Sequence, residues 1–244
     1  LADTLLIGVT QFFRDEDAFR VIKNQIVPEL IQRAQVDKKP IRIWVPGCAT
    51  GQEAYTFALL FAEAFQDLPN RIEVQIFATD IKRDFLGIAG RGEFTHEQVG
   101  SIPNNLLEKY FTLNDESRKY LIDSEVRKMI VFAPHDILTD PPFTRLNMIT
   151  CRNMLIYFSI EAQQKILSGF SFGLVDKGIL FLGSSETVGA HREAFEFIDA
   201  KNRIFRRTQV KRLSPSYQAP LDRALKESSR LGISRRAIKF REAA

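Results

Sequence analysis

One segment of the sequence, Val45 to Ala58 (VPGCATGQEAYTFA), constrains the fold more than any other. The residues just before it, Ile41 to Trp44, are mostly apolar and β-prone, whereas the apolar residues from Ala54 onward recur at the spacing of one helical face. The segment therefore predicts a strand, a glycine-rich turn and a helix, in that order. Glycines in such a turn let the backbone approach a ligand, and the start of the helix behind them offers unpaired N–H groups. The turn is therefore a candidate ligand site.

The glycine pattern by itself does not identify the ligand. Gly47 and Gly51 form a G-x-x-x-G pattern, which lacks the Lys-Ser/Thr ending of a phosphate-binding P-loop. It also matches the dinucleotide pattern G-x-G-x-x-G only loosely. An ordinary tight turn between a strand and a helix is the alternative interpretation.

Length and composition favour one globular domain. The chain has 244 residues, of which 45% are hydrophobic, enough to bury a full core, and no apolar run approaches the ~18 residues of a membrane span. It lacks a signal peptide and begins at Leu1 rather than Met, so we expect it to be a piece of a longer protein. The two cysteines, Cys48 and Cys151, have no metal-ligand neighbours in sequence, which favours a reduced, cytoplasmic setting and no metal site.

The net charge of +4 is concentrated at the C-terminal end. Residues 206–244 contain eleven Lys/Arg and three Asp/Glu, a net charge of +8, which leaves the first 205 residues at −4. A basic segment rich in Ser, Pro and Arg is typical of a solvated linker, and residues 221–238 have apolar side chains at helical spacing. We therefore expect a folded domain over residues 1–206 and a basic tail or linker, helical in part, over 207–244. Contact of this tail with nucleic acid or a membrane surface is the less favoured alternative.

Apolar periodicity predicts that helices and strands alternate along the rest of the chain. Asp15 or Asp17 can cap a helix that ends before a turn at Lys38 to Pro40. This alternation favours an α/β fold with a doubly wound, mostly parallel sheet that binds ligands at the carboxyl ends of its strands. The segment from Gly90 to Val126 departs from it and predicts a small lobe inserted into the sheet. The expected strands are 41–45, 72–78, 146–150, 179–182 and 202–206, the expected helices are 83–89, 106–111 and 160–174, and a strand pair is expected at 119–122 and 126–132.

Polar residues follow each predicted strand and should gather at one edge of the sheet. Asp80, at the end of the second strand, suits a ribose because a carboxylate can accept hydrogen bonds from both hydroxyls. Taken singly, it is equally suited to cap the helix that follows. The full set is Glu53 after the first strand, Asp80 after the second, His135 and Asp136 after the third, Cys151, Arg152 and Asn153 after the fourth, and Ser184 to Glu186 after the fifth.

Six segments of the sequence point to one known family. They are TQFFRD (10–15), GCATGQEAYT (47–56), ATDI (78–81), FAPHDIL (132–138), CRNMLIYF (151–158) and LGSSE (182–186). Together, over roughly residues 1–206, they resemble the CheR family of chemotaxis receptor methyltransferases, which use S-adenosylmethionine to esterify glutamate side chains. The resemblance implies a class I, Rossmann-like methyltransferase fold with a small inserted β-subdomain at about residues 90–130.

The resemblance also implies a role for each matched residue near the cofactor's methionine and ribose portions. Thr10 and Arg14 would lie over the cofactor, with Arg14 near the transferring methyl group. Glu53 falls on the second acid of the family's GEE segment and would hold the cofactor's amino group. Asp80 would accept from the ribose hydroxyls, and Gly47 belongs to the turn beneath the cofactor.

Further matches would complete the pocket around the adenine and the reacting methyl group. Asp136 and Ile137 match the family's Asn-Leu pair near the adenine. Cys151 and Arg152 match the family's Cys-Arg pair. Tyr157 would lie by the reacting methyl, and the alternative for this residue is an aromatic side chain of the core.

The expected chemistry needs orientation more than acid–base help. A glutamate side chain with a pKa of about 4.3 is already ionised at neutral pH, so it attacks without a general base. Transfer from a sulfonium is an in-line displacement that is helped when the acceptor oxygen, the methyl carbon and the sulfur are held in line. We therefore expect Arg14 and Tyr157 to aim the acceptor carboxylate, and S-adenosylhomocysteine is the expected product.

Four positions depart from the family pattern. Gln52 replaces the first acid of the GEE segment, and Gly8 stands where an Asn often precedes the Thr. Asp136 replaces an Asn, and Asn147 replaces an Asp in the strand before CRN. None of these changes removes the two cofactor acids, but Asp136 alters the hydrogen bonds available at the adenine because an ionised carboxylate can only accept.

The start of the chain at TQFFRD implies that the helical N-terminal domain of free-standing members is absent. We therefore expect a methyltransferase module of a larger signalling protein, whose acceptor is the cytoplasmic domain of a chemoreceptor or of another signalling protein. One rival is a non-catalytic module that senses S-adenosylmethionine. The other is a nucleic-acid amino-methyltransferase, suggested by DPPF at Asp140 to Phe143; here this motif precedes a strand instead of following one, which favours a proline-fixed loop.

Overall fold

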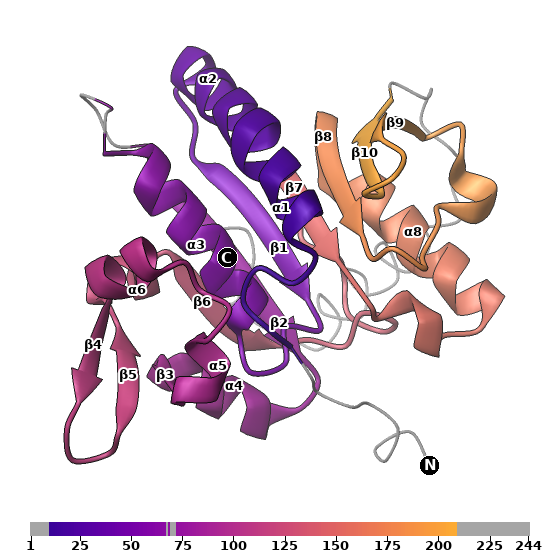
Figure 1. Ribbon diagram of the computed structural model, residues 1–244. Coiled ribbons are helices and arrows are strands. Elements are labelled where there is room, and N and C mark those ends of the chain that lie inside the picture. Colours follow the sequence, from indigo (N-terminus) through magenta and orange to yellow (C-terminus); the bar gives the residue numbers. More distant parts are fainter. Residues whose placement is uncertain (1–9, 67, 69–71, 209–244) are drawn as a thin grey trace, which may run out of the picture. The chain divides into compact units, whose positions relative to one another are not determined.

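A seven-stranded sheet forms the centre of the computed structural model, which describes residues 10–66, 68 and 72–208 (Figure 1). The strand order is β6-β2-β1-β7-β8-β10-β9. Neighbouring strands run parallel from β6 to β8, and β10 is antiparallel to both β8 and β9. The strands are β1 (Ile41–Pro46), β2 (Val74–Asp80), β6 (Ile130–Pro134), β7 (Leu146–Cys151), β8 (Leu174–Leu182), β9 (Phe195–Asp199) and β10 (Ile204–Arg207).

The chain order of the strands reverses at the centre of the sheet. From β1 the chain builds outward through β2 to β6, and it then crosses back to β7 and builds outward in the other direction. In open α/β sheets such a switch point leaves a crevice beyond the carboxyl ends of the two central strands, and ligands bind there. The region beyond Pro46 and Cys151, the last residues of β1 and β7, is therefore the candidate ligand site.

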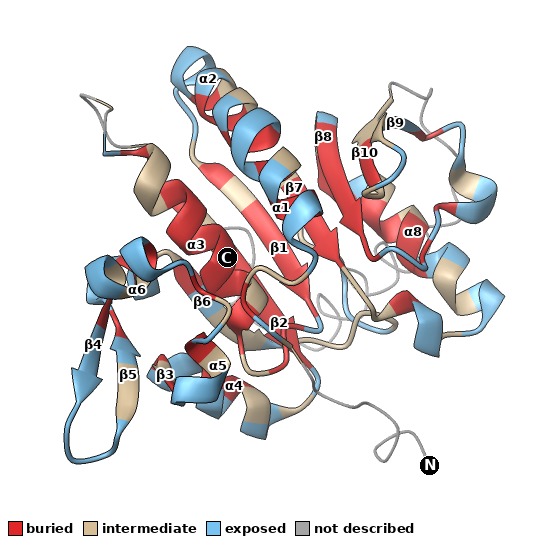
Figure 2. Ribbon diagram, in the orientation of Figure 1, coloured by how far each residue is buried: buried red, intermediate tan, exposed pale blue. Residues whose placement is uncertain are grey.

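Helices cover both faces of the sheet, and most residues of the central strands β1, β2 and β7 are buried (Figure 2). Alternate residues of β1 face opposite layers. Ile43 belongs to the core beneath the first helices, whereas the Trp44 ring lies 5.2 Å from Phe143 and 5.6 Å from Phe170 on the other face. The helices of the first layer are α1 (Glu16–Val21), which continues through a π-helical turn (Ile22–Ile26) into α2 (Val27–Asp37), together with α3 (Gln52–Ala64) and α4 (Arg83–Arg91), and α8 (Ile160–Gly173) lies on the other face.

A small lobe is inserted between α4 and β6. It contains an antiparallel sheet in the order β3-β5-β4 and lies beside α3 and α4 in Figure 1. The lobe comprises β3 (Glu93–Phe94), α5 (His96–Val99), α6 (Asn104–Tyr110), β4 (Phe111–Asn114), β5 (Lys119–Ile122) and α7 (Ser124–Lys128).

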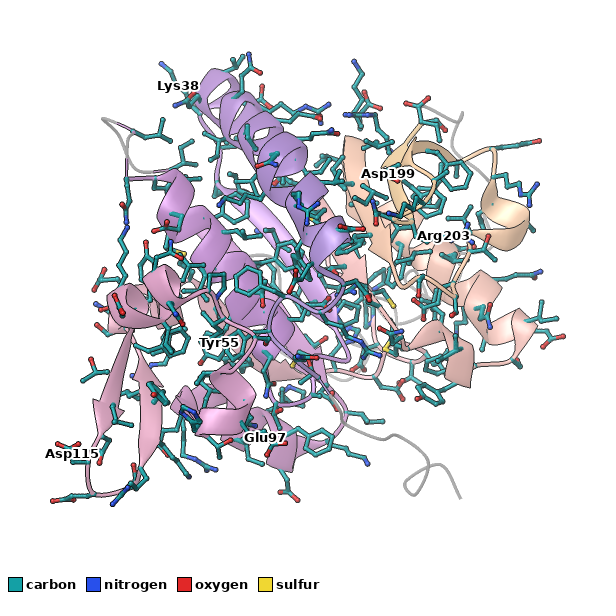
Figure 3. All side chains as sticks on the ribbon, viewed as in Figure 1. Lys38, Tyr55, Glu97, Asp115, Asp199 and Arg203 are labelled. Carbon is teal, nitrogen blue, oxygen red and sulfur yellow. The ribbon has the colours of Figure 1, made fainter. Side chains whose placement is uncertain are left out.

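Phe12, from the segment that precedes α1, inserts into this lobe. Its side chain is fully buried, with its ring centroid 4.9 Å from that of Phe94 and 5.9 Å from that of Phe111. The Ser101 hydroxyl also donates to the Phe12 carbonyl, at 2.9 Å. Tyr55 of α3, labelled in Figure 3, also packs on Phe94, with ring centroids 5.4 Å apart. The lobe and the segment that precedes α1 therefore share one apolar core.

Most of the expected elements are present, and the doubly wound α/β sheet is confirmed. The predicted strand pair at 119–122 and 126–132 is wrong, because Val126 lies in α7 and residues 130–134 form β6 of the main sheet. The partners of β5 are instead β3 and β4. Strand β9, the outermost strand, was not expected. The predicted helix at 221–238 and Gly8 lie outside the described residues.

The capping prediction for Asp15 is also wrong. Asp15 occupies the residue before α1, but its φ of 65° is left-handed and its side chain makes no capping bond. Asp17 lies inside α1, where its carboxylate accepts from Lys201 at 3.0 Å. Across the described ranges, no helix is both long and apolar enough to cross a bilayer.

Candidate functional site

The glycine turn at the end of β1 adopts a backbone that few other residues could take. Gly47 has a φ of 65° and Gly51 a φ of 93°. A Cβ built on Gly47 would lie 2.6 Å from the Met154 sulfur, and one on Gly51 would lie 2.9 Å from the Ala89 Cβ. Gly47 is itself exposed, so the turn presents bare backbone at the switch point of the sheet.

Asp80 connects this turn to β2. Its Oδ2 accepts from the Ala49 N–H and its Oδ1 accepts from the Lys82 N–H, both at 2.9 Å. It does not cap α4 with its side chain, because Lys82 is the residue before that helix and no side-chain cap bond forms there. Both oxygens keep further acceptor capacity, since a carboxylate offers about four lone-pair sites. Asp80 therefore lies at the turn with acceptor capacity to spare, and its role toward a ligand stays a prediction.

Glu53, in the first turn of α3, reaches across to the end of β7. Its Oε1 accepts from the Thr150 hydroxyl at 2.5 Å, and its Oε2 accepts from Arg152 Nη1 at 3.0 Å. Its side chain keeps 16% exposure. One carboxylate therefore joins the start of α3, the helix that follows β1, to the end of β7.

Arg152 lies at the centre of a buried network. Its side chain is 1% exposed, and its guanidinium carbon lies 5.2 Å from the Phe19 ring centroid and 4.7 Å from that of Phe181. Nη2 donates to the Arg14 carbonyl at 2.9 Å and forms an ion pair with the Asp15 carboxylate. The network thus joins the residue after β7 to the segment that precedes α1.

That segment, residues 10–15, crosses the site with an unusual backbone. Phe13 and Asp15 have left-handed φ values of 51° and 65°. The Phe13 N–H donates to the Thr56 hydroxyl of α3 at 3.2 Å. Thr10 and Arg14 are both half-buried. The structure therefore places the backbone carbonyl of the predicted residue Arg14 in the same network as Glu53 and Arg152.

The predicted adenine pair follows β6. Asp136 and Ile137 are half-buried, and the Asp136 Oδ1 accepts from the Leu138 N–H at 2.9 Å. Asp140 in turn accepts from the Asp136 N–H at 2.9 Å. The Asp136 carboxylate thus organises its own turn, two strands away from β1.

Both cysteines are inaccessible. Cys48 is 2% exposed and Cys151 is fully buried. Burial, as the largest cause, raises the pKa of both thiols well above the ordinary value. Cys151 can therefore face a ligand through its backbone only. Among the described residues, no group of three or more His, Cys, Asp or Glu is placed to hold a metal ion.

Tyr157 lies at the surface rather than in the core. It ends a short 3₁₀ helix (Leu155–Tyr157) whose first residue is buried at 1%, whereas Tyr157 itself is 49% exposed. The alternative interpretation of Tyr157 as a core aromatic is therefore wrong. Ile156 beside it is 48% exposed, so Tyr157 lies on an exposed, partly apolar part of the surface after β7.

Glu186 has a role that the sequence did not reveal. It is 3% exposed, and its Oε1 accepts from the N–H groups of Met154 and Leu155 at 2.8 and 2.7 Å. Its Oε2 accepts from Asn153 at 3.0 Å and from Gly183 at 2.7 Å. One buried carboxylate thus holds the loop between Arg152 and Tyr157. The sequence places Glu186 among the polar residues that follow the fifth predicted strand, but it does not indicate the N–H groups that this carboxylate binds.

The donors and acceptors at the switch point fit an adenosine ligand with a charged amino-acid portion. Bare glycine backbone lies at the turn, Asp80 offers acceptors at the end of β2, and Glu53 offers acceptors at the start of α3. These are the groups that bind a ribose and an ammonium group.

Comparison with known proteins identifies the family. Residues 8–217 match the family described as CheR methyltransferase, SAM binding domain. A chemotaxis protein methyltransferase of Borreliella burgdorferi is 30% identical over 196 residues, which are 79% of this chain and 69% of that protein. A 104.1 kDa protein of Rhodobacter capsulatus, described as uncharacterized, is 40% identical over 201 residues, which are 82% of this chain but 21% of that protein.

One solved structure with a similar fold is a more distant match. PKMT2 from Rickettsia typhi in complex with AdoHcy is 16% identical, with a TM-score of 0.36, and the similarity covers 58% of this chain and 20% of that one. The family match spans most of the sequence. The chain therefore belongs to the CheR family of S-adenosylmethionine-dependent methyltransferases and forms its S-adenosylmethionine-binding domain.

Proposed function

We propose that this domain transfers the methyl group of S-adenosylmethionine to glutamate side chains of a signalling protein, of the chemoreceptor kind, and produces glutamate methyl esters and S-adenosylhomocysteine. The observation that carries the proposal is a glycine turn with Glu53 and Asp80 as its acids, against which the loop after β7 packs through Met154, and this loop ends in the 49% exposed Tyr157. The Borreliella burgdorferi relative named chemotaxis protein methyltransferase supports the same substrate class.

A glutamate acceptor needs no histidine of this chain as a general base. The chain contains three histidines, and each has contacts of its own. His135 contacts the Pro141 carbonyl at 3.1 Å and packs on Trp44, His96 packs on a tyrosine of the lobe, and His191 contacts a carbonyl of α8. A glutamate carboxylate needs no proton removed before it attacks, so these contacts do not hinder its methylation.

Positioning is then the main task of the protein. Bound S-adenosylmethionine supplies an electrophilic methyl group. Glu53 would hold the amino group of its methionine portion and Asp80 its ribose hydroxyls, both as acceptors. The Arg14 guanidinium and the Tyr157 hydroxyl are the donors that would aim the acceptor carboxylate along the line of the displacement.

A neutral donor such as Tyr157 suits this task. A tight ion pair would lower the nucleophilicity of the carboxylate, whereas one phenol hydrogen bond orients it at less cost. Removal of the hydroxyl should therefore lower turnover more than cofactor affinity.

The DPPF motif is accounted for by packing. Phe143 stacks on Phe77 with ring centroids 5.0 Å apart and also contacts Trp44. A Cβ on Gly173, at the end of α8, would lie 2.4 Å from the Phe143 carbonyl. The motif thus leads toward the start of β7, away from the cofactor turn, which disfavours a nucleic-acid amino-methyltransferase.

The test is transfer of label from S-adenosylmethionine to receptor cytoplasmic domains, followed by base treatment. Methyl esters hydrolyse in base and release the label, whereas methylamines keep it. Tyr157→Phe should lower kcat at nearly unchanged affinity for S-adenosylhomocysteine, and Tyr120→Phe in the lobe serves as the matched control. Base-stable label would contradict the proposal, and cofactor binding without transfer to any receptor glutamate would favour a sensory module instead.

A further inference from the structure

Arg152 connects three segments that are far apart in the sequence. It follows β7, and its guanidinium reaches Glu53 on α3 at 3.0 Å, the Arg14 carbonyl at 2.9 Å, and the Asp15 carboxylate. These partners lie 99, 138 and 137 residues away. A single side chain therefore holds the segment before α1 against the start of α3.

The guanidinium has little surface left for a ligand. Phe19 and Phe181 lie against it, and the whole side chain is 1% exposed. Nη1 and Nη2 point at protein acceptors, and Nε is buried without a partner in the described part of the chain. A planar guanidinium with several donors suits this bridging task better than the single point charge of a lysine.

The backbone that Arg152 contacts has an uncommon conformation. Phe13 and Asp15 both have left-handed φ values, which are uncommon for residues other than glycine. Arg152 binds this turn through the Arg14 carbonyl and the Asp15 carboxylate, and the Thr56 hydroxyl accepts from the Phe13 N–H. The direction of the Arg14 side chain depends on this turn.

We infer that Arg152 is a positioning residue. Together with Asp15 its guanidinium fixes the Arg14 turn and the Glu53 carboxylate over the cofactor site, and this side chain, which is 1% exposed, does not itself bind the cofactor. The inference rests on the proposed function only for the task of Arg14 at the reacting methyl group.

Asp15→Asn is the most informative variant. The Asp15 side chain is 48% exposed, so the substitution leaves no buried cavity. Asparagine tolerates the left-handed backbone as well as aspartate does, so the change removes the charge and not the turn propensity. Asp17→Asn is the matched control, because Asp17 lies two residues on, is 55% exposed and pairs with Lys201 and Arg20.

Hydrogen exchange of the ligand-free full chain tests the inference first. In Asp15→Asn, amide exchange at residues 12–16 should be faster by about tenfold, the factor that corresponds to about 1.4 kcal/mol and to one charge-assisted hydrogen bond. In Asp17→Asn it should stay within about twofold. Equal exchange at these amides in the two variants would overturn the inference.

Titration with S-adenosylhomocysteine and a double-mutant cycle separate positioning from direct contact. In Asp15→Asn, Kd should stay within about threefold while kcat falls by about tenfold, and the loss should be non-additive with Arg14→Lys, as expected of coupled residues. Additive losses would contradict coupling through the turn. Arg152→Lys provides a second variant: faster exchange at residues 12–16 supports the inference, whereas a weaker Kd with unchanged exchange would show that Arg152 contacts the cofactor.

Exchange and titration need no methyl acceptor. A failure of glutamate methylation would therefore leave both results interpretable, and a failure of the positioning role would leave the base-lability test of the methyl product unchanged.

Discussion

Replacing Glu186 with glutamine should loosen the loop that carries Arg152 and Tyr157. The carboxylate accepts four backbone N–H groups, two at each oxygen, while it is 3% exposed. The glutamine amide keeps one oxygen, so two of the four donors would face an NH₂ group that cannot accept. Two buried N–H groups would lose their partner at almost unchanged side-chain volume.

The magnitude follows from the number of bonds lost. A hydrogen bond to a charged group contributes about 1.5–3 kcal/mol, so the loss of two costs about 3 kcal/mol at the lower end of that range. For a domain of about 200 residues, 1 kcal/mol corresponds to about 2–4 °C in Tm, so Glu186→Gln should lower Tm by about 6–12 °C.

Thermal unfolding followed by circular dichroism measures this shift. Glu125→Gln is the control, because the Glu125 side chain is 62% exposed and pairs only across one helical turn with Lys128. That control should move Tm by less than about 2 °C. If Glu186→Gln unfolded at the same temperature as the control, the carboxylate would not be what holds the loop.

Three further predictions concern other positions. Gly47→Ala should lower the free energy of unfolding by about 1–2 kcal/mol, because alanine is strained at a φ of 65°, and an unchanged urea midpoint would argue against that backbone. Cys48 and Cys151 should resist a thiol reagent at about pH 8 in the native protein and react on unfolding, because burial raises the pKa of both; rapid native labelling would show that the thiols are accessible. A hydrogen bond from Arg206 is the largest cause that lowers the pKa of Glu29 from its ordinary value of 4.5, so the stability that this ionised group contributes is present above that value and is lost as pH falls through the lower, folded-state pKa. The difference in urea midpoint between the parent and Glu29→Gln should accordingly shrink from about pH 6 to about pH 3.5, and a constant difference would contradict the linkage.

The main sheet could be predicted because its strands are buried and its helices amphipathic. The sequence of β1 and α3 switches from a continuous apolar run to helical periodicity at the glycine turn, and both elements are present as expected. The lobe was harder, because its elements are short. The predicted strand starts at Val126, but Asp123 caps α7 by accepting from the backbone of Glu125 and Val126, so the chain turns there before β6 begins.

The site could be predicted as a set of residues but not as a network. Strand order places Glu53, Asp80 and Arg152 at one edge of the sheet, and this follows from topology alone. The sequence could not show that the Asp15 carboxylate binds Arg152 instead of capping α1, because the partner lies 137 residues away. The role of Glu186 could not be predicted for a different reason: its carboxylate accepts from backbone N–H groups, which leave no mark on side-chain composition.

The insertion of Phe12 into the lobe bears on how the lobe can diverge among relatives. The lobe leaves the main sheet after β2 and returns at β6, two neighbouring strands, so its interior could in principle be exchanged as a cassette. Phe12 comes from outside that cassette, yet its ring is enclosed by Phe94 and Phe111. A lobe taken from a relative would therefore need apolar side chains that pack around this ring. Without them, residues 10–15 would lose the packing of Phe12, two positions from Arg14. Recombination at this boundary is therefore constrained by one phenylalanine outside the exchanged segment.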